Sequence, residues 1–349
     1  MKRNVIWLMC IGIAVIFIGS SSMAWGENIE QTQGDKTTYV FKMATIAPEQ
    51  LGWAALIRDI VNPGIDKATN GRVVLDWYYG GRMGDDTDIL AKMINGQLQG
   101  GGFSGHGMVM VCPEMTLFAL PFLFNNYDEV EYVYSKMRPR INEWFEKRGY
   151  HLVILAEQGF DQIYSTKREI RTFDDIKKSR FQTWYGPMEE KTLMALGASP
   201  VPVRPTEVSA AVRTGICDAL ISPAIWAVGA QLYSVMKYIN PLSIRYSPAG
   251  GVVSLKAWNK LPKEEQIAVD NYIKTMEKDF RQKIRAINEK GIAAMYKHGM
   301  KEVKMTPDET EAFKNRVLHV WDDFAEKEYY SKDDLDYVKK LLAEFRSKK

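Results

Sequence analysis

The sequence is poor in the residues that build metal centres and disulfide frameworks. Its 349 residues include 3 cysteines and 4 histidines. No two cysteines form a C-x-x-C pair, and no histidine stands at metal-ligand spacing from a second ligand. The sequence also lacks an excess of one charge, because 46 basic and 43 acidic residues leave a net charge of +3. These absences argue against a metal centre and against a nucleic-acid-binding surface.

Long hydrophobic runs are scarce as well. The apolar run at 5–19 has about fifteen residues, fewer than the roughly 20 that a helix needs to cross a bilayer. It follows two basic residues and precedes a segment of small residues, which predicts a signal peptide over 1–24 with cleavage near Ala24 or Gly26. We therefore expect a soluble, exported protein. An uncleaved membrane anchor is the alternative.

The remaining composition is that of an ordinary globular protein. Hydrophobic residues make up 46% of the chain and charged residues 26%, and the length suits two domains better than one. Two cysteines, Cys112 and Cys217, lie beyond the expected signal peptide and could pair in an exported protein. We expect instead two unpaired, buried thiols.

Expected strands alternate with expected helices along the chain, which predicts an α/β fold with largely parallel sheets. The polar segment 25–37 is expected to be a flexible leader. Strands are predicted at 38–46, 72–79, 151–156, 162–165, 179–184, 217–221 and 251–254. Helices are predicted at 86–95, 128–147, 188–196 and 207–214, with a long helix from Pro262 and an interruption of an earlier helix at 62–64. A glycine at 197 and a capping box at 306–309 mark helix ends.

The sequence contains only partial matches to known catalytic and cofactor-binding motifs. Residues 100–105 (GGGFSG) satisfy G-x-G-x-x-G, but no strand is predicted before them, as a dinucleotide site requires. The same loop resembles a hydrolase elbow around Ser104, but His106 stands where that motif needs glycine. No nucleophile, base and oxyanion site come together. We therefore expect a protein without catalytic activity, metal or cofactor.

Several short sequence segments resemble those of a known protein family. They are KMATIAPEQLGW, KATNGRV, GGRMGDD, LPFLFNNYDEV, FDDIKKSRF, ALGASPVPVRPTEVSAAVRTGICDALISP, YINPLSIRYSPAGGVVSLKAW and NKLPKEEQ. In this order the chain resembles the solute receptors of tripartite ATP-independent periplasmic (TRAP) transporters, the dicarboxylate-receptor (DctP) family. The resemblance implies a receptor that captures a small polar organic solute without a cofactor. It also implies delivery of the solute to a membrane permease with a small and a large subunit.

The resemblance further implies a two-lobe periplasmic-binding-protein fold (type II-like). Hinge strands and a long helix would span both lobes, and a ligand would be enclosed when they close. Lobe 1 is expected to comprise 38–157 and 248–285. Lobe 2 is expected to comprise 158–247 and 286–349.

The chain departs from the family where a ligand carboxylate is usually held. The family strand that corresponds to 179–184 usually carries an arginine that clamps the carboxylate through a bidentate pair, and Gln182 stands there. Asp161 stands where the family frequently has a second arginine, and Ser222 stands where an asparagine is common. These changes predict a neutral, zwitterionic or amine-bearing ligand, with Asp161 meeting its positive or hydrogen-bond-donating end.

Alternatives remain for the charged residues. Asp161 could instead pair with Arg180 or Arg204 as a structural strut, because buried charges are usually paired. One of these two arginines could also replace the missing clamp and hold a carboxylate. At the level of function, the alternatives are a ligand-sensing receptor with a signalling partner and a secreted enzyme on a similar fold.

Further candidate ligand-binding residues follow from the strand end and from loops that the family directs at the cleft. The aromatic residues Trp184 and Tyr185 are expected as cleft walls, with ordinary core packing as the alternative. Glu207 either reaches the site or caps a helix. The remaining candidates are Trp226, Phe103, Ser104, Asp86 and Thr45.

Overall fold

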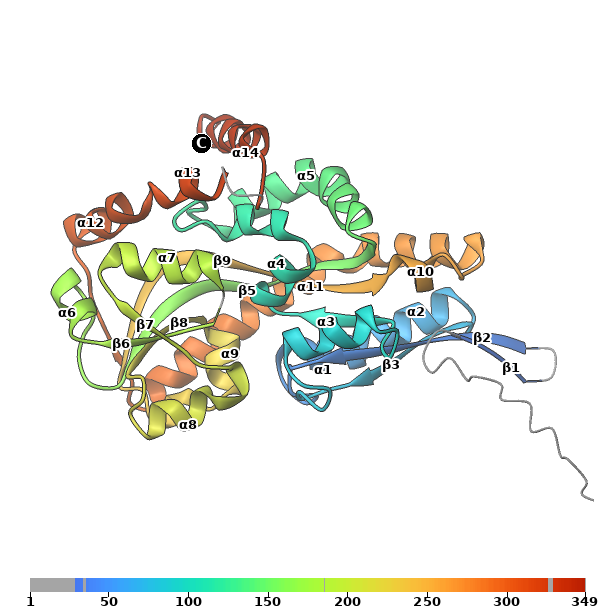
Figure 1. Ribbon diagram of the computed structural model, residues 1–349, viewed down its shortest axis with the longest axis horizontal. Helices are drawn as coiled ribbons and strands as arrows, with labels where there is room; N and C mark the ends of the chain where they lie inside the picture. The colour runs from blue at the N-terminus through green and yellow to red at the C-terminus, as the bar shows by residue number, and fades with distance from the viewer. Residues whose placement is uncertain (1–28, 34–35, 185, 326–328, 349) are drawn as a thin grey trace, which may run out of the picture.

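The computed structural model describes residues 29–33, 36–184, 186–325 and 329–348, and its strands form one ten-stranded sheet (Figure 1). The strand order is β1-β2-β4-β9-β5-β8-β6-β7, with β3 also paired to β2 and β10 to β9. The strands are β1 Glu30–Gln33, β2 Lys36–Thr45, β3 Val73–Tyr78, β4 Gly100–Phe103, β5 Tyr150–Ser165, β6 Arg180–Thr183, β7 Ser199–Pro202, β8 Ala219–Pro223, β9 Tyr238–Ser254 and β10 Lys301–Glu302.

Two long antiparallel strands, β5 and β9, connect the two halves of the molecule. Their ladder runs from the pair Tyr150 and Ser254 to the pair Ser165 and Tyr238. At one end β9 also pairs with β4, and at the other end β5 pairs with β8. The expected two-lobe α/β fold with shared hinge strands is therefore confirmed.

The ladder is irregular where the two expected lobes meet. One of its register shifts lies between Glu157 and Gly159, opposite Pro248 and Ser247. Gly159 has a φ of 104°, in the region that favours glycine, and a Cβ there would lie 2.6 Å from the amide nitrogen of Asn288. A β-bulge bends a strand locally, so this position suits a hinge between lobes.

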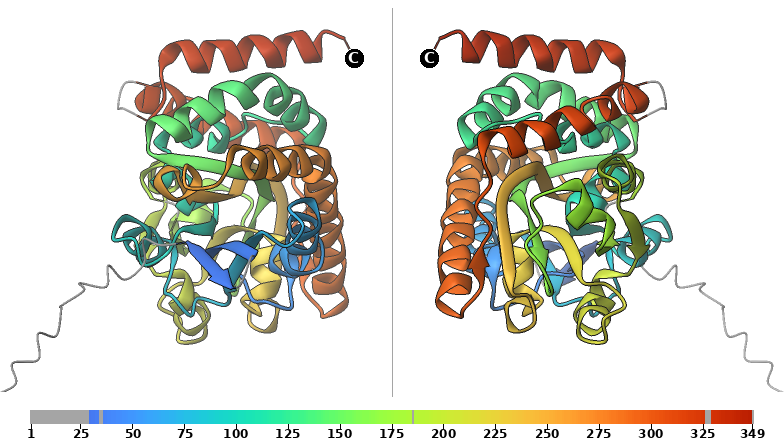
Figure 2. Two further views of the ribbon diagram at one scale, coloured as in Figure 1. Left: turned by 90° about the vertical axis from the view of Figure 1, so that its right-hand side faces the viewer. Right: turned by 90° about the vertical axis from the view of Figure 1, so that its left-hand side faces the viewer.

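The helices cover both faces of the sheet (Figure 2), and the longest of them, α11, spans both lobes (Figure 1). Near its start Glu264 accepts a hydrogen bond from Arg72, and near its end Asn288 donates to the carbonyl of Gln158. The α-helices are α1 Gly52–Leu56, α2 Asn62–Ala68, α3 Asp86–Ile94, α4 Gly105–Val111, α5 Tyr127–Lys147, α6 Phe173–Lys177, α7 Pro187–Leu196, α8 Val208–Arg213, α9 Ala224–Gly229, α10 Leu255–Trp258, α11 Lys263–Lys297, α12 Pro307–Val317, α13 Val320–Ala325 and α14 Lys332–Arg346. Shorter helical turns are η1 Ile57–Val61, η2 Pro113–Ala119, η3 Pro205–Glu207 and η4 Leu232–Ser234. No helix within the described ranges is both long and apolar enough to cross a membrane.

Three local expectations differ from the structure. The predicted flexible leader contains β1, which pairs with β2, so that part of it is ordered by strand pairing. The helix does not break at 62–64, because the π-helical turn η1 leads directly into α2, and Pro63 follows this turn. The two strands expected at 151–156 and 162–165 are one strand, β5, which continues through its bulges. The expected signal peptide lies outside the described residues.

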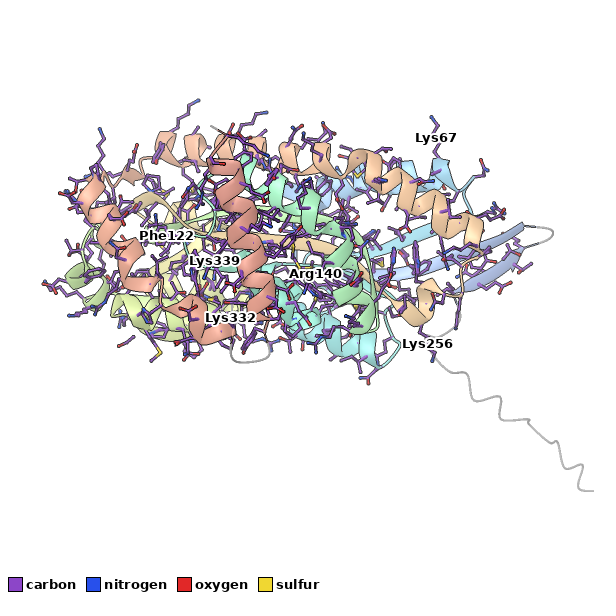
Figure 3. All side chains as sticks on the ribbon, turned by 90° about the horizontal axis from the view of Figure 1, so that it is seen from above. Lys67, Phe122, Arg140, Lys256, Lys332 and Lys339 are labelled. Carbon is purple, nitrogen blue, oxygen red and sulfur yellow. The ribbon has the colours of Figure 1, made fainter. Side chains whose placement is uncertain are left out.

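The C-terminal helix α14 also departs from the expected lobe division. It packs on α5 of lobe 1, where Arg346 pairs with Glu129 at 2.8 Å and Asp334 pairs with Arg140. Figure 3 shows Lys332 and Lys339 along this helix, with Arg140 close by on α5. The apolar stripe of α14 joins the same core as α5. The chain therefore returns from lobe 2 to lobe 1 before it ends.

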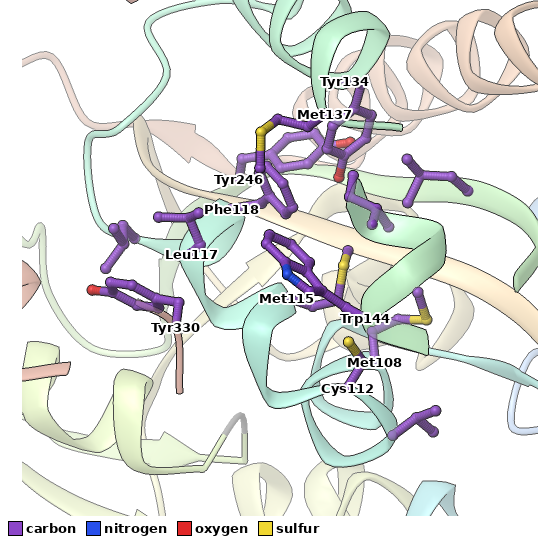
Figure 4. Packing of buried hydrophobic residues seen from close by; sticks show 14 of the residues in the cluster. Met108, Cys112, Met115, Leu117, Phe118, Tyr134, Met137, Trp144, Tyr246 and Tyr330 are labelled. Carbon is purple, nitrogen blue, oxygen red and sulfur yellow. The ribbon is translucent and has the colours of Figure 1, made fainter. Parts of the chain in front are cut away.

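The core beneath α5 is built largely from aromatic and sulfur-containing side chains. Figure 4 shows Phe118, Trp144 and Tyr246 packed together, with Cys112 and Met115 close by. Cys112 and Cys217 are both buried and free, as expected.

Candidate functional site

A cavity of about 320 Å³ lies between the two lobes. Ile46, Trp53 and Ser104 line it from lobe 1, and Gln158, Thr206 and Trp226 line it from lobe 2. A narrower cavity shares four of its lining residues with the first, and Gln182, Trp184 and Ser222 also line it. The two cavities together form one interlobe cleft, as the two-lobe architecture predicts.

The lining of the cleft carries no formal charge. Among the described residues, no aspartate, glutamate, lysine, arginine or histidine lines either cavity. The polar side chains of the lining are Ser104, Gln158, Gln182, Thr206 and Ser222. Most of the remaining wall is apolar, which is typical of a site that encloses a small organic molecule.

Five residues that the sequence placed in the cleft line it, namely Gln182, Ser222, Trp184, Ser104 and Trp226. Gln182 on β6 is buried, and its Nε2 donates to the carbonyl of Val203 at 3.2 Å. Ser222 on β8 donates to the carbonyl of Pro223 at 2.9 Å. Trp184 follows β6, and its ring lies 4.9 Å from that of His106 across the lobes. Tyr185 lies outside the described residues.

Ser104 and Asp86 form a buried pair on the lobe 1 side of the cleft. The Ser104 hydroxyl, at the N-cap of α4, donates to Oδ2 of Asp86 in the first turn of α3. Ser104 also accepts from the backbone N–H of Gly107 at 3.4 Å. Burial raises the pKa of Asp86 to about 6, although its hydrogen bond with Ser104 acts in the opposite direction.

Asp161 does not reach the cleft lining but lies in a buried ion cluster. Oδ2 of Asp161 accepts from Nε and Nη2 of Arg245 at 2.8 and 2.5 Å, and Arg245 also donates to Glu189 at 2.9 Å. Burial raises the pKa of Asp161 to about 6, and Arg245 counteracts this shift. The expected partners, Arg180 and Arg204, are therefore corrected to Arg245, which pairs with Asp161 across the β5–β9 ladder.

The same cluster supports the wall of the cleft. Oε1 of Glu189 accepts from the backbone N–H of Trp184 at 2.9 Å, while its Oε2 binds Arg245. Glu189 lies in the first turn of α7, where a carboxylate is favourable. The buried cluster thus connects the hinge strands to the segment that carries Trp184.

Neither arginine proposed as a replacement clamp lines the cleft. The Arg180 side chain is 52% exposed and lies 3.7 Å from Asp218. Arg204 is equally exposed, and it binds Asp85 at 2.6 Å and Asp88 at 2.7 Å across the lobes. Arg204 therefore forms ion pairs beside the cleft that join lobe 2 to the start of α3, and we call this contact the clasp.

Three other candidate residues lie outside the lining of the cleft. Phe103 is fully buried in the core, and Thr45 is buried with its hydroxyl accepting from the backbone N–H of Ala47 at 3.2 Å. Glu207 is exposed, and its side chain makes no cap hydrogen bond to α8. None of these three lines either cavity. No cluster of three or more potential metal ligands occurs among the described residues.

Gln158 is a polar cleft residue that sequence reasoning missed, and it also missed Thr206, Ile46 and Trp53 in the lining. The Oε1 of Gln158 accepts from the backbone N–H of Gly105 and from the hydroxyl of Ser247, both at 3.2 Å. Gln158 stands in β5, where the preceding residues 151–156 are almost all apolar. A polar residue inside such a strand is an informative exception, and this signal could have identified it.

Two α/β lobes that share a pair of strands and enclose an uncharged cleft define a two-lobe solute-binding protein. The sequence profile of the DctP family, described as bacterial extracellular solute-binding protein, family 7, matches residues 62–328. The chain belongs to this family of TRAP solute-binding proteins. The family and the structural neighbours are solute-binding receptors and not enzymes.

Similar proteins and structures agree with this assignment. The ectoine-binding periplasmic protein TeaA of Halomonas elongata is 24% identical over 260 residues, which cover 71% of this chain and 74% of TeaA. A TRAP solute-binding protein of Haemophilus influenzae with bound L-gulonate has a TM-score of 0.80 at 23% identity, covering 86% and 99% of the two chains. Its counterpart from Xanthobacter autotrophicus Py2 with bound β-D-galacturonate has a TM-score of 0.80 at 19% identity, covering 87% and 99%.

Proposed function

We propose that this chain is an exported solute receptor that captures a small organic molecule between its lobes and delivers it to a TRAP permease. The permease would consist of a small and a large membrane subunit. The family membership and the interlobe cleft support this role.

We further propose that the ligand carries no net negative charge. The observation behind this proposal is that Gln182 lines the cleft at the expected place of the carboxylate clamp, without a charged residue in the described lining. A buried carboxylate without a paired cation costs several kcal/mol. Arg180 and Arg204 are engaged elsewhere. Asp161 does not add to this reasoning, because Arg245 already neutralises it.

The solute that co-purifies with the receptor tests the proposed role. The full chain would be produced in a bacterial host and isolated under native conditions, and the bound molecule would be released and identified by mass spectrometry. We expect a neutral or zwitterionic compound that rebinds to the stripped protein in calorimetry. An anionic solute with micromolar affinity would refute the ligand class, and turnover of the bound compound would refute the receptor role.

Installing the arginine that is usual in the family gives a second test. Gln182→Arg places a cation in the narrower cavity, so we expect binding of D-galacturonate or L-gulonate to rise at least tenfold over the wild type. Arg180→Gln is the matched control, because Arg180 lies outside the cleft. Tight binding of these acids by the wild type, abolished by Arg180→Gln, would show that the carboxylate alternative is correct.

A further inference from the structure

We propose that the cleft recognises hydrogen-bond donors on its ligand, through the hydroxyl oxygens of Ser104 and Ser222, whose protons are committed to the protein, and through the amide oxygen of Gln182. We also assign Asp86 as the positioning residue that fixes Ser104 as an acceptor. This inference deepens the proposed function and rests on it, because it names the chemistry that the receptor selects.

The Ser104 hydroxyl illustrates the arrangement. Its proton is donated to the Asp86 carboxylate, and one of its two lone pairs accepts from the N–H of Gly107. The remaining lone pair is available on a residue that lines both cavities. Ser104 can therefore accept a hydrogen bond from a ligand but has no proton to offer one.

Two further side chains of the narrower cavity also present hydrogen-bond acceptors. The Ser222 hydroxyl donates to the carbonyl of Pro223, which leaves its oxygen as an acceptor. One of the two N–H donors of Gln182 Nε2 is used by the carbonyl of Val203, and Oε1 accepts no hydrogen bond from another described residue. Three acceptors from β6, β8 and the start of α4 thus line a space of about 10 Å³, room for one small donor group, beside the 320 Å³ cavity.

The burial of Asp86 explains how the direction of the Ser104 proton is enforced. Asp86 is fully buried, and its Oδ1 has no hydrogen-bond partner among the described residues. An ionised carboxylate only accepts hydrogen bonds, so Ser104 must be the donor of the pair. An asparagine at this position could either accept from Ser104 or donate to it, and the direction would no longer be fixed.

This chemistry specifies a ligand class. Amide N–H, hydroxyl and ammonium groups satisfy a set of acceptors, whereas a carboxylate would meet their lone pairs without a neutralising cation. The apolar wall from Ile46, Trp184 and Trp226 suits a ligand with an apolar face. The expected ligand is a small, partly apolar molecule that carries donors at one end.

Three molecules of the same shape test this selectivity at pH 8, where Asp86 is ionised. Benzoate presents only acceptors, benzamide presents an amide N–H₂, and benzamidinium presents only donors. Calorimetry with the stripped full chain should give dissociation constants for benzamide and benzamidinium at least tenfold lower than for benzoate. Benzoate binding as tightly as benzamide would overturn the proposal, and so would failure of all three to bind.

Variants separate the positioning role of Asp86 from general damage. In Asp86→Asn the tenfold discrimination against benzoate should fall below about threefold, a change in ratio that a purely structural role would not produce. Ser222→Ala should weaken benzamide binding about tenfold, in line with a lost hydrogen bond, without affecting the helix cap at Ser104. Asp174→Asn, an exposed aspartate in the first turn of α6, is the control and should change nothing. Unchanged discrimination in Asp86→Asn would overturn the role of Asp86.

The two proposals can fail separately. A co-purified solute that is neutral but donor-poor, such as a ketone or ether, would leave the receptor role intact and refute donor recognition. A protein that isolates without any solute and binds none would refute the receptor role itself.

Discussion

The buried Asp86 carboxylate makes a quantitative prediction for stability against pH. Burial raises its pKa from 3.8 to about 6 in the folded protein. The folded protein therefore binds this proton at a higher pH than the unfolded chain, so that the proton stabilises the fold as the pH falls through 6. Stability from this group is fully present below about pH 4 and is lost as the pH rises above 6.

The magnitude follows from the two pKa values. Linkage gives about 1.4 kcal/mol between pH 8 and pH 5, and about 3 kcal/mol over the full range. Replacing Asp86 with asparagine removes this contribution. The free energy of unfolding of Asp86→Asn, relative to the wild type, should therefore fall by about 1.4 kcal/mol from pH 8 to pH 5.

Urea unfolding of both proteins across this pH range measures the difference. Asp161, whose pKa is also raised to about 6, contributes equally to both proteins and cancels. Asp174→Asn is the control for the substitution itself, because it makes the same chemical change at an exposed position. If the difference between Asp86→Asn and wild type is flat, Asp86 is not a buried charge and the reasoning fails.

The clasp, the ion cluster and the hinge give three further predictions. Arg204→Ala should speed release of the co-purified solute about threefold at low salt and less at high salt, measured by stopped flow. Arg213→Ala is its control, because Arg213 donates hydrogen bonds to Ser209 and Ser234 of its own lobe. Arg245→Gln leaves two buried carboxylates without their cation and should lower the free energy of unfolding by about 3–5 kcal/mol in urea; a loss below about 1 kcal/mol would contradict the role of the cluster. Gly159→Ala forces a Cβ towards Asn288 at a positive φ, so calorimetry should show a loss of about 1–3 kcal/mol, and unchanged stability would show that the hinge does not require glycine.

Features set by nearby residues were predictable from the sequence. The capping box at Thr306 and Glu309 is present with both of its hydrogen bonds. Gly197 ends α7 in the left-handed conformation, with a φ of 94°. The α/β alternation and the long α11 were likewise readable from hydrophobic spacing, because these signals act within a few residues.

Features set by packing were harder to predict. The strand β4 consists of three glycines and Phe103, a composition with little intrinsic strand preference. Its glycines are needed for space, since a Cβ on Gly102 would lie 2.3 Å from the Trp53 ring. No local pattern reveals that requirement.

The candidate site shows the same division between local and long-range signals. Gln182 and Ser222 were placed in the cleft from the family resemblance and Trp184 from its position at a strand end, and all three line the cleft. The partner of Asp161 could not be found in this way, because Arg245 is opposite it only in the finished ladder. Bulges shift that ladder three times, so the register cannot be counted from sequence alone.

The shared strands β5 and β9 also constrain how the protein folds. Their ladder joins Tyr150 to Ser254 and Ser165 to Tyr238, so the central pairing closes a very long stretch of chain. Such distant pairings slow folding, because the entropy of loop closure must be lost before their contacts form. The lobe 1 strand β4 cannot complete its pairing with β9 until β9, which is much later in the chain, is in place. A slow approach to the native state leaves unpaired strand edges exposed for longer, which would favour transport of the unfolded chain across a membrane but also aggregation at high concentration.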